Sequence, residues 1–340
     1  MIKLITEFTV RRLVQITFAL MTIIIGGQFI LFVHQLKIGA EHVISRPPGV
    51  EAFLPISSLM SLKYWLLSGD FPMVHPSGLL LFSIIALTAL LIKRGFCAWV
   101  CPFGLLNEIL GKIHVWIFGK AHRVWTWLDY PLRSLKYLLL FFFAWAVLVQ
   151  MNVPALKAFI YSPYNKVADI KMLDFFIHAT PLTVKVLIAL VLLSILVRNF
   201  WCRYLCPYGA LLGALSWLSP FKIRRNAETC IDCEKCTTAC PMNINVHKPK
   251  TVMSDECHAC LQCVSVCPVQ DTLSLSAPKR KWPIKPVLYG AIIVGMFLLT
   301  SLTARLFGVW KNDIRLDEYR YFIKHLDQYD HARGQASQQE

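Results

Sequence analysis

A long stretch without charge near the start of the chain sets its class. From Leu13 to Val33 the sequence runs for 21 residues without Lys, Arg, Asp or Glu, enough for a helix to cross a hydrocarbon core ~30 Å thick. The run is too long for the apolar core of an ordinary signal peptide, so we expect a retained anchor. The chain is 56% hydrophobic, against roughly 45–50% in soluble domains. The sequence therefore predicts an integral membrane protein.

Five apolar segments in all are candidate membrane spans. Lys and Arg gather in the connections after the second and the fourth segment, with twelve between Arg198 and Lys285 alone. Because such loops stay in the cytoplasm, the sequence predicts a cytoplasmic N-terminus and a C-terminal tail on the outside. The predicted spans are Leu13–Val33, Pro76–Ile92, Tyr137–Val153, Pro181–Val197 and Pro286–Leu302.

Eight cysteines in the long connection after the fourth span form two copies of one spacing. Each copy reads Cys-x2-Cys-x2-Cys-x3-Cys-Pro, the spacing of bacterial two-cluster ferredoxins, in which the fourth Cys of each copy binds the other cluster. Zinc ribbons and disulfides are the alternatives, but two complete copies with both prolines favour clusters. The predicted ligands are Cys230, Cys233, Cys236 and Cys267 for one [4Fe–4S] cluster, and Cys257, Cys260, Cys263 and Cys240 for the other.

A shorter cysteine pattern also occurs twice, each time at the end of a predicted span. Cys97, Cys101, Pro102 and Gly104 recur at an offset of 105 as Cys202, Cys206, Pro207 and Gly209. Thiols four residues apart lie on one face of a helical turn. One hypothesis is therefore a shared metal centre, most simply iron–sulfur, on Cys97, Cys101, Cys202 and Cys206. The alternatives are two independent dithiol pairs, or four buried free cysteines that pack as small hydrophobic residues.

The net charge of +15 has causes other than nucleic acid. Cytoplasmic loops of membrane proteins concentrate Lys and Arg. Thiolates on iron–sulfur clusters would offset part of the sum, because each four-Cys site carries roughly −2. We therefore expect no nucleic acid among the partners.

The combination of motifs resembles a known family. Paired CxxxCP motifs at the ends of spans, followed by a two-cluster ferredoxin module, resemble the membrane polyferredoxins related to NapH, the C-terminal half of NosR, and CcoG, and above all their NapH/YccM-like branch. The resemblance covers about residues 13–302. It implies electron transfer between the quinol pool or a cytoplasmic donor and respiratory partners, as in a 4Fe-4S quinol dehydrogenase. The fifth span and charged tail depart from the simplest four-span form. Unlike NosR, the chain is expected to lack an extracytoplasmic flavin-binding domain.

Three functions from different classes fit these motifs. The first is an electron-transfer subunit of an oxidoreductase system that oxidises quinol, with His34, His42 and His75 near the predicted outer face as candidate quinone contacts. The second is a metal- or thiol-reducing assembly factor for a respiratory metalloenzyme. The third is a membrane scaffold with structural clusters. Expected partners are membrane lipid, a quinone and a redox protein such as a cytochrome, a flavoprotein or an iron–sulfur protein.

The predicted fold is a polytopic α-helical membrane protein with a two-fold pseudo-repeat and a small α+β ferredoxin-like domain. Its divisions are a membrane domain with four spans (1–218), a two-cluster domain (219–278), a fifth span (279–304) and a charged tail outside the cytoplasm (305–340). We expect a multi-pass protein of the bacterial inner membrane. The N-terminus and the ferredoxin-like domain would lie in the cytoplasm, and the tail in the periplasm.

Overall fold

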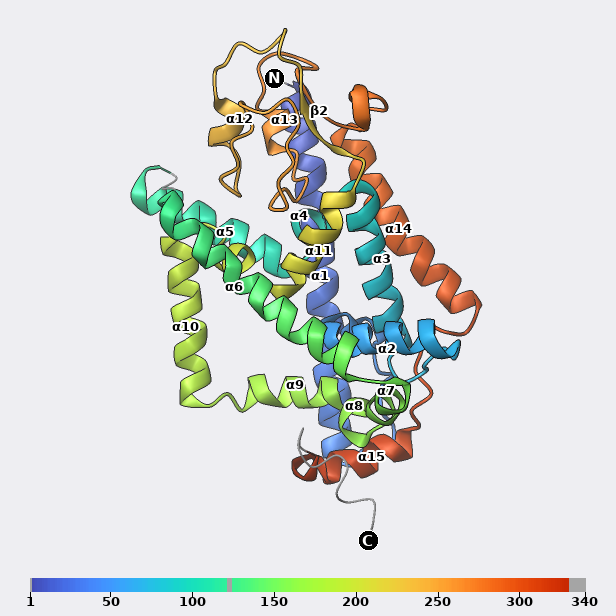
Figure 1. Ribbon diagram of the computed structural model, residues 1–340. Coiled ribbons are helices and arrows are strands. Elements are labelled where there is room, and N and C mark those ends of the chain that lie inside the picture. Colours follow the sequence, from blue (N-terminus) through green and yellow to red (C-terminus); the bar gives the residue numbers. More distant parts are fainter. Residues whose placement is uncertain (1, 121–123, 330–340) are drawn as a thin grey trace. The chain divides into compact units, whose positions relative to one another are not determined.

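The computed structural model describes residues 2–120 and 124–329, which are mostly helical (Figure 1). The N-terminal half contains α1 (Ile2–Lys37), η1 (Pro48–Phe53), α2 (Pro55–Ser68), α3 (Pro76–Ile92), α4 (Phe96–Trp99), α5 (Pro102–Phe118), α6 (Thr126–Trp145), η2 (Ala146–Gln150), α7 (Val153–Ile160), α8 (Pro163–Lys166) and α9 (Ala168–Ile177). The C-terminal half contains α10 (Pro181–Leu196), η3 (Trp201–Leu205), α11 (Pro207–Leu218), β1 (Lys222–Arg225), α12 (Lys235–Thr238), α13 (Gln262–Ser265), β2 (Leu273–Ser276), η4 (Pro278–Arg280), α14 (Pro286–Leu306), α15 (Leu316–Lys324) and η5 (Leu326–Gln328).

Within residues 2–120 and 124–329, three helical segments are long and apolar enough to span a membrane: Val10–Lys37, Trp127–Gln150 and Pro286–Leu306. They correspond to the first, third and fifth predicted spans. The fourth predicted span, α10, meets this criterion only together with α9, from which it bends by 85° (Figure 1). The second, α3, is apolar but has only 17 residues. The structure thus contains about three candidate spans, and five spans remain a prediction.

The chain divides into two compact units. Unit 1 comprises Met1–Leu20, Ile85–Phe142 and Lys185–Met296, and unit 2 comprises Met21–Ile84, Phe143–Val184 and Phe297–Glu340. The chain therefore passes between the units at five points, and each point lies inside one of the five predicted spans. Unit 1 collects the connections predicted to be cytoplasmic, whereas unit 2 collects those predicted to lie outside.

Unit 1 contains the small cysteine-rich module. Its two strands, β1 and β2, pair antiparallel from Lys222↔Ser276 to Arg225↔Leu273. Ile223 and Leu275 are buried beneath this ribbon. The short helices α12 and α13 begin just before the third cysteine of each copy of the spacing. This is the small α+β arrangement expected for residues 219–278.

In unit 2 the charged segment near the C-terminus is packed rather than fully exposed. Tyr319 and Phe322 of α15 are buried in one apolar cluster with Phe32 and Val33 of α1. Tyr319 meets the ring of Phe32 edge-on, with 5.6 Å between centroids. Aromatic residues three apart give an otherwise charged helix one apolar face, which composition alone did not reveal. Residues 330–340 of the predicted tail lie outside the described residues.

Candidate metal centres

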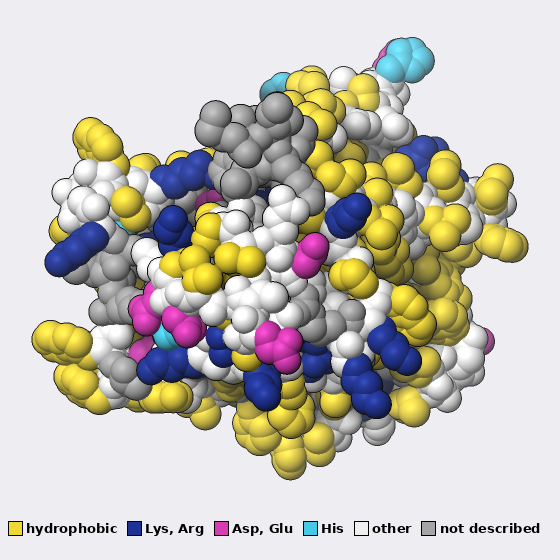
Figure 2. All heavy atoms as spheres, turned by 90° about the horizontal axis from the view of Figure 1, so that it is seen from above, with side chains coloured by type: hydrophobic (Ala, Val, Ile, Leu, Met, Phe, Trp, Pro, Cys, Tyr) yellow, Lys and Arg dark blue, Asp and Glu magenta, His cyan; other side chains and the backbone are white. Residues whose placement is uncertain are grey.

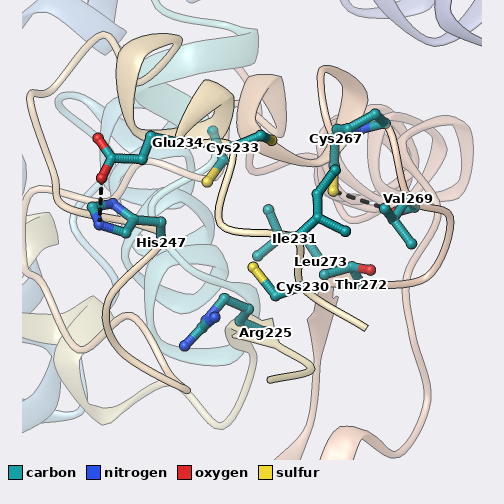
Figure 3. A pocket seen from close by; sticks show the side chains of 12 residues that line it. Arg225, Cys230, Ile231, Cys233, Glu234, His247, Cys267, Val269, Thr272 and Leu273 are labelled. Carbon is teal, nitrogen blue, oxygen red and sulfur yellow. Dashed lines mark hydrogen bonds and ion pairs between the residues drawn. The ribbon is translucent and has the colours of Figure 1, made fainter. Parts of the chain in front are cut away.

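The first cysteine-lined cavity lies at the surface of the module (Figure 3). It has about 360 Å³ of space free of protein atoms, part of it open solvent. Cys233 is exposed, Cys230 and Cys267 are half-buried, and Cys236 is buried. An ion pair of 3.2 Å between His247 and Glu234 closes one side. The cysteines that line this cavity are Cys230, Cys233, Cys236 and Cys267.

The second cavity has a similar size, about 370 Å³ including open solvent, but its cysteines are more deeply buried. Three of the four are buried and Cys260 is half-buried. Its cysteines are Cys240, Cys257, Cys260 and Cys263. The lining of the two cavities contains the two sets of cysteines, with Cys240 and Cys267 exchanged between the copies; that these sets are cluster ligands stays a prediction. No three His, Cys, Asp or Glu side chains within residues 2–120 and 124–329 are placed to hold a single metal ion.

The backbone is left-handed at the same two positions of both cysteine loops. Asp232 and Ala259 precede the second cysteine of their copies with φ of 48° and 49°, and Glu234 and Leu261 follow it with φ of 57° and 60°. One left-handed residue on each side of the second cysteine turns the loop back on itself. Such a loop can present three thiols to one cavity, which is the reason for the tight x2 spacing.

The four cysteines of the CxxxCP motifs lie in unit 1, and the thiols of each motif influence those of the other. The pKa of Cys97 is raised to about 11 and that of Cys101 to about 12, chiefly by burial and in smaller part by the Cys206 thiol. The pKa of Cys202 is raised first by burial and then by Cys206, Cys101 and Cys97. Thiols from the two repeats are therefore close enough to interact electrostatically. The ring of Phe96 also meets that of Tyr208, with 6.1 Å between centroids.

The Pro-aromatic-Gly sequence after each pair of cysteines starts a helix and so determines the position of the second thiol of the pair. Cys101 and Cys206 are the N-cap residues of α5 and α11, and each is followed by Pro at the first helical position, where its missing N–H costs nothing. The Cys206 sulfur accepts a 3.2 Å hydrogen bond from the Gly209 N–H. At Gly104 a Cβ would lie 2.0 Å from the carbonyl oxygen of Cys97, so only glycine fits there.

A buried network of charges joins the CxxxCP site to the module. Arg94 bonds the carboxylate of Glu256 at 3.3 Å and also the Gly209 carbonyl oxygen at 2.9 Å. Lys136 of α6 bonds Glu256 as well, and Arg133 bonds Asp255 at 2.9 Å. Cations from the membrane segments therefore hold the two residues that precede Cys257.

This network has more positive than negative charge. Lys93 is buried, donates to the Ser254 carbonyl oxygen at 3.2 Å and interacts with Asp255. Burial lowers the pKa of Lys93 to about 8, so the side chain is mostly charged at neutral pH. Four cations, namely Lys93, Arg94, Arg133 and Lys136, thus face two carboxylates. Burial raises the pKa of Cys97 and of Cys206, and Arg94 offsets part of this rise, because a nearby cation favours the thiolate.

Both repeats bond the loops of the second cavity. From the second repeat, Arg203 donates to the Met242 carbonyl oxygen, and Asn199 donates to that of Pro241 at 2.7 Å. These acceptors follow Cys240 directly. From the first repeat, Trp99 donates to the Ala259 carbonyl oxygen, between Cys257 and Cys260. The second cavity is therefore the one next to the CxxxCP motifs.

The candidate quinone histidines do not form one site. His75 is buried, with Nε2 2.6 Å from the Asn165 carbonyl oxygen and Nδ1 3.5 Å from Glu51. Arg46 bonds Glu51 at 2.7 Å, so His75 belongs to a buried ionic network in unit 2. His34 and His42 are exposed. We therefore make no quinone assignment from these histidines.

The basic residues of the module are partly used within it. Arg224 donates to the Thr251 hydroxyl at 3.0 Å, and Arg225 donates to the Lys248 carbonyl oxygen at 3.3 Å. Figure 2 shows Lys and Arg side chains beside Asp and Glu on the face that carries α12 and α13. This surface is mixed in charge rather than uniformly basic.

Sequence reasoning missed the charges around Asp255 and Glu256. These two acidic residues precede Cys257 directly, while their cationic partners lie more than a hundred residues earlier. A signal was present in the Lys and Arg residues close to predicted span ends, namely Lys93, Arg94, Arg133 and Lys136. We read them only as markers of orientation.

Two domain families match the chain at its cysteine motifs. A family described as a 4Fe-4S binding domain matches residues 74–121 and again 180–226, so each match contains one CxxxCP motif. A family described as a 4Fe-4S dicluster domain matches residues 222–268. No solved structure matches the chain.

Several known proteins are similar to the chain. The putative electron transport protein YccM of Escherichia coli is 41% identical over 93% of this chain and 90% of its own length. The regulatory protein NosR of Pseudomonas aeruginosa is 28% identical over 59% of this chain and 28% of its own length. The ferredoxin-type protein NapH of Haemophilus influenzae is 26% identical over 54% of this chain and 63% of its own length. The chain therefore belongs to the NapH/NosR-type membrane polyferredoxin family, in its YccM-like branch.

Proposed function

We propose that the protein is a membrane-bound iron–sulfur electron-transfer protein that links a redox partner protein to the quinone pool. The observation that carries this proposal is the arrangement of cysteines in unit 1. Two four-cysteine cavities lie in one module, and the segments that carry four further cysteines bond the loops of the second cavity. The names of similar proteins, which include an electron transport protein and a ferredoxin-type protein, agree with this role.

The two cavities would each hold one [4Fe–4S] cluster, which supplies reversible one-electron transfer when bound. Four thiols around a space of this size suit such a group. The ligands would be Cys230, Cys233, Cys236 and Cys267 in the first cavity, and Cys240, Cys257, Cys260 and Cys263 in the second. The loop backbone holds the thiols in place, and the left-handed residues keep each loop turned toward its cavity.

The CxxxCP cysteines would share a third centre. Buried thiols release their protons only where positive charge compensates the thiolates. Four thiolates on an iron–sulfur cluster carry roughly −2 in total, and the surrounding network has two cations more than carboxylates. The match of the 4Fe-4S binding family to both motifs also supports this centre. Its ligands would be Cys97, Cys101, Cys202 and Cys206.

The assembly-factor alternative is less well supported. Thiol or metal reduction by these cysteines needs accessible thiolates, whereas burial raises the pKa of Cys97 and of Cys101. Two independent dithiols would also leave the buried surplus of cations without a function. Electron transfer through a permanent centre therefore fits the site better.

The difference in exposure between the two cavities suggests which site exchanges electrons with a soluble partner and which with the membrane. The first cavity has the exposed Cys233 and is open to a soluble partner such as a flavoprotein or another iron–sulfur protein. The second is bonded to both CxxxCP segments. Electrons would then exchange with the partner at the first cavity and with the membrane at the CxxxCP centre, whichever the direction of net flow.

The proposed location is the bacterial inner membrane, with five crossings. In support, the chain changes unit at five points, each within a predicted span. Lys and Arg excess then puts unit 1 in the cytoplasm and the tail in the periplasm. A reporter fused after Glu340 should be active only outside the cytoplasm. A cytoplasmic signal would mean that the number of crossings is even.

Electron transfer itself can be tested in quinone-containing vesicles. A membrane-impermeant reductant added to the module side should reduce the cysteine-bound iron, and quinol should then accumulate. Cys233→Ala should slow this reaction by removing the entry point. A wild-type protein whose iron is reduced but never yields quinol would contradict the quinone link.

A further inference from the structure

One tryptophan joins the two kinds of cysteine site in unit 1. Trp99 lies between Cys97 and Cys101 in sequence, and its side chain is fully buried. Its indole N–H donates a 3.0 Å hydrogen bond to the carbonyl oxygen of Ala259. Ala259 lies one residue before Cys260. A short chain of covalent bonds with one hydrogen bond therefore runs from the first CxxxCP motif to the second cavity.

The ring of Trp99 packs against Tyr289 and Gly290 of α14. It meets the ring of Tyr289 with 5.4 Å between centroids, and the Tyr289 hydroxyl donates to the Ile92 carbonyl oxygen at 2.9 Å. A Cβ at Gly290 would lie 2.7 Å from the Trp99 ring. The absence of a side chain at this position therefore makes room for the indole and fixes its orientation.

The equivalent residue of the second repeat makes a different contact. Tyr204 stands at the position of Trp99, 105 residues later. Its hydroxyl donates to Asp129 at 2.6 Å, and Asp129 also pairs with Arg203. Tyr204 is also buried. The pseudo-repeat therefore offers a control with similar burial whose side chain donates to Asp129 rather than to a carbonyl oxygen of the second cavity.

We propose that Trp99 provides the electronic coupling between the second cavity and the CxxxCP centre, which rests on the proposed function. Trp99 would couple one-electron exchange between the groups that the two sets of cysteines would hold, and no bond would form or break. The aromatic ring and its hydrogen bond shorten the gap that the electron must cross. Trp99 is thus a positioning and coupling residue, not a ligand.

The test compares wild type, Trp99→Phe and Tyr204→Phe as anaerobically purified holoproteins. Phe keeps an aromatic ring but cannot donate to Ala259, and it lacks the outer indole atoms that lie nearest Gly290. After a light flash with a soluble photoreductant, rapid freezing and EPR follow how fast the electron reaches the CxxxCP signal. Trp99→Phe should slow this redistribution several-fold, whereas Tyr204→Phe should leave it near the wild-type rate.

Two further measurements distinguish a loss of electronic coupling from a loosening of the structure around Trp99. Iron content and the dipolar broadening between the reduced centres should be unchanged in Trp99→Phe, because neither ligands nor distances change. An unchanged rate in this variant, or an equal slowing in Tyr204→Phe, would overturn the inference. A slower rate accompanied by lost iron or altered broadening would also overturn it, in favour of a structural role. If the wild type lacks a CxxxCP signal altogether, the shared centre itself fails, and the coupling inference fails with it.

Discussion

The two cavities of the module have the same cysteine spacing and left-handed backbone at the same loop positions, yet their surroundings differ. The first has an exposed cysteine and a rim that includes the half-buried His247. The second is bonded to both CxxxCP segments and adjoins the buried carboxylate of Glu256. Local sequence thus determines the shape of a cluster site, while the tertiary contacts determine what the site can exchange electrons with.

The largest effect is expected from removing one cysteine of each cavity. Cys233→Ala should lose one cluster, about four Fe by cluster stoichiometry, and weaken the other. Cys263→Ala should lose the second cluster and also loosen the loops that Trp99 and Arg203 hold. Iron analysis and limited proteolysis of the module measure both effects. Equal protease sensitivity in the two variants would contradict the difference between the cavities.

A smaller effect is expected from removing one carboxylate beside each cavity. Glu256→Gln leaves Arg94 and Lys136 without their buried partner, which typically costs about 3–5 kcal/mol. Asp232→Asn weakens a 3.5 Å pair with Arg225 and a 3.5 Å hydrogen bond from the Cys230 thiol, on a side chain that is 75% exposed, and should cost about 0–1 kcal/mol. Thermal unfolding in detergent measures the two changes. A Glu256→Gln protein as stable as Asp232→Asn would show that the network does not hold the module.

The smallest difference is expected in the order of cluster loss. A mild oxidant with an iron chelator should remove iron in two phases, because Cys233 is exposed while Cys240, Cys257 and Cys263 are buried. The first phase should release about four Fe and should be faster in Cys230→Ser. Absorbance and chelated iron follow the time course. Release of all iron in one phase would remove the distinction between an open and a closed cavity.

Much of this arrangement could be predicted where the signal is local. The Cys-x2-Cys-x2-Cys spacing predicted the grouping of cysteines around the two cavities, because three ligands lie within seven residues. The apolar runs predicted α1, α6 and α14. Helix lengths were less predictable: α6 extends through Arg133 and Lys136, whose charges are matched by Asp255 and Glu256 far along the chain.

Contacts between distant segments could not be predicted in this way. The residues near Trp99 in sequence do not indicate that its indole N–H donates to the Ala259 carbonyl oxygen or that its ring packs against Gly290. Likewise, the aromatic face of α15 could be found by its spacing, but its position against α1 depends on tertiary packing. The sequence predicted the cysteines of each site, and the structure adds the contacts between the sites.

The most direct test of the account is a count of iron and acid-labile sulfide, with an EPR redox titration, in wild type, Cys97→Ala and Cys202→Ala. The account predicts about twelve Fe in the wild type, from three four-iron centres. Either variant should fall to about eight Fe and lose the same EPR signal, and the double variant should lose little more, because the four ligands act as a unit. About eight Fe in the wild type, with each CxxxCP pair open to separate alkylation, would contradict the shared centre.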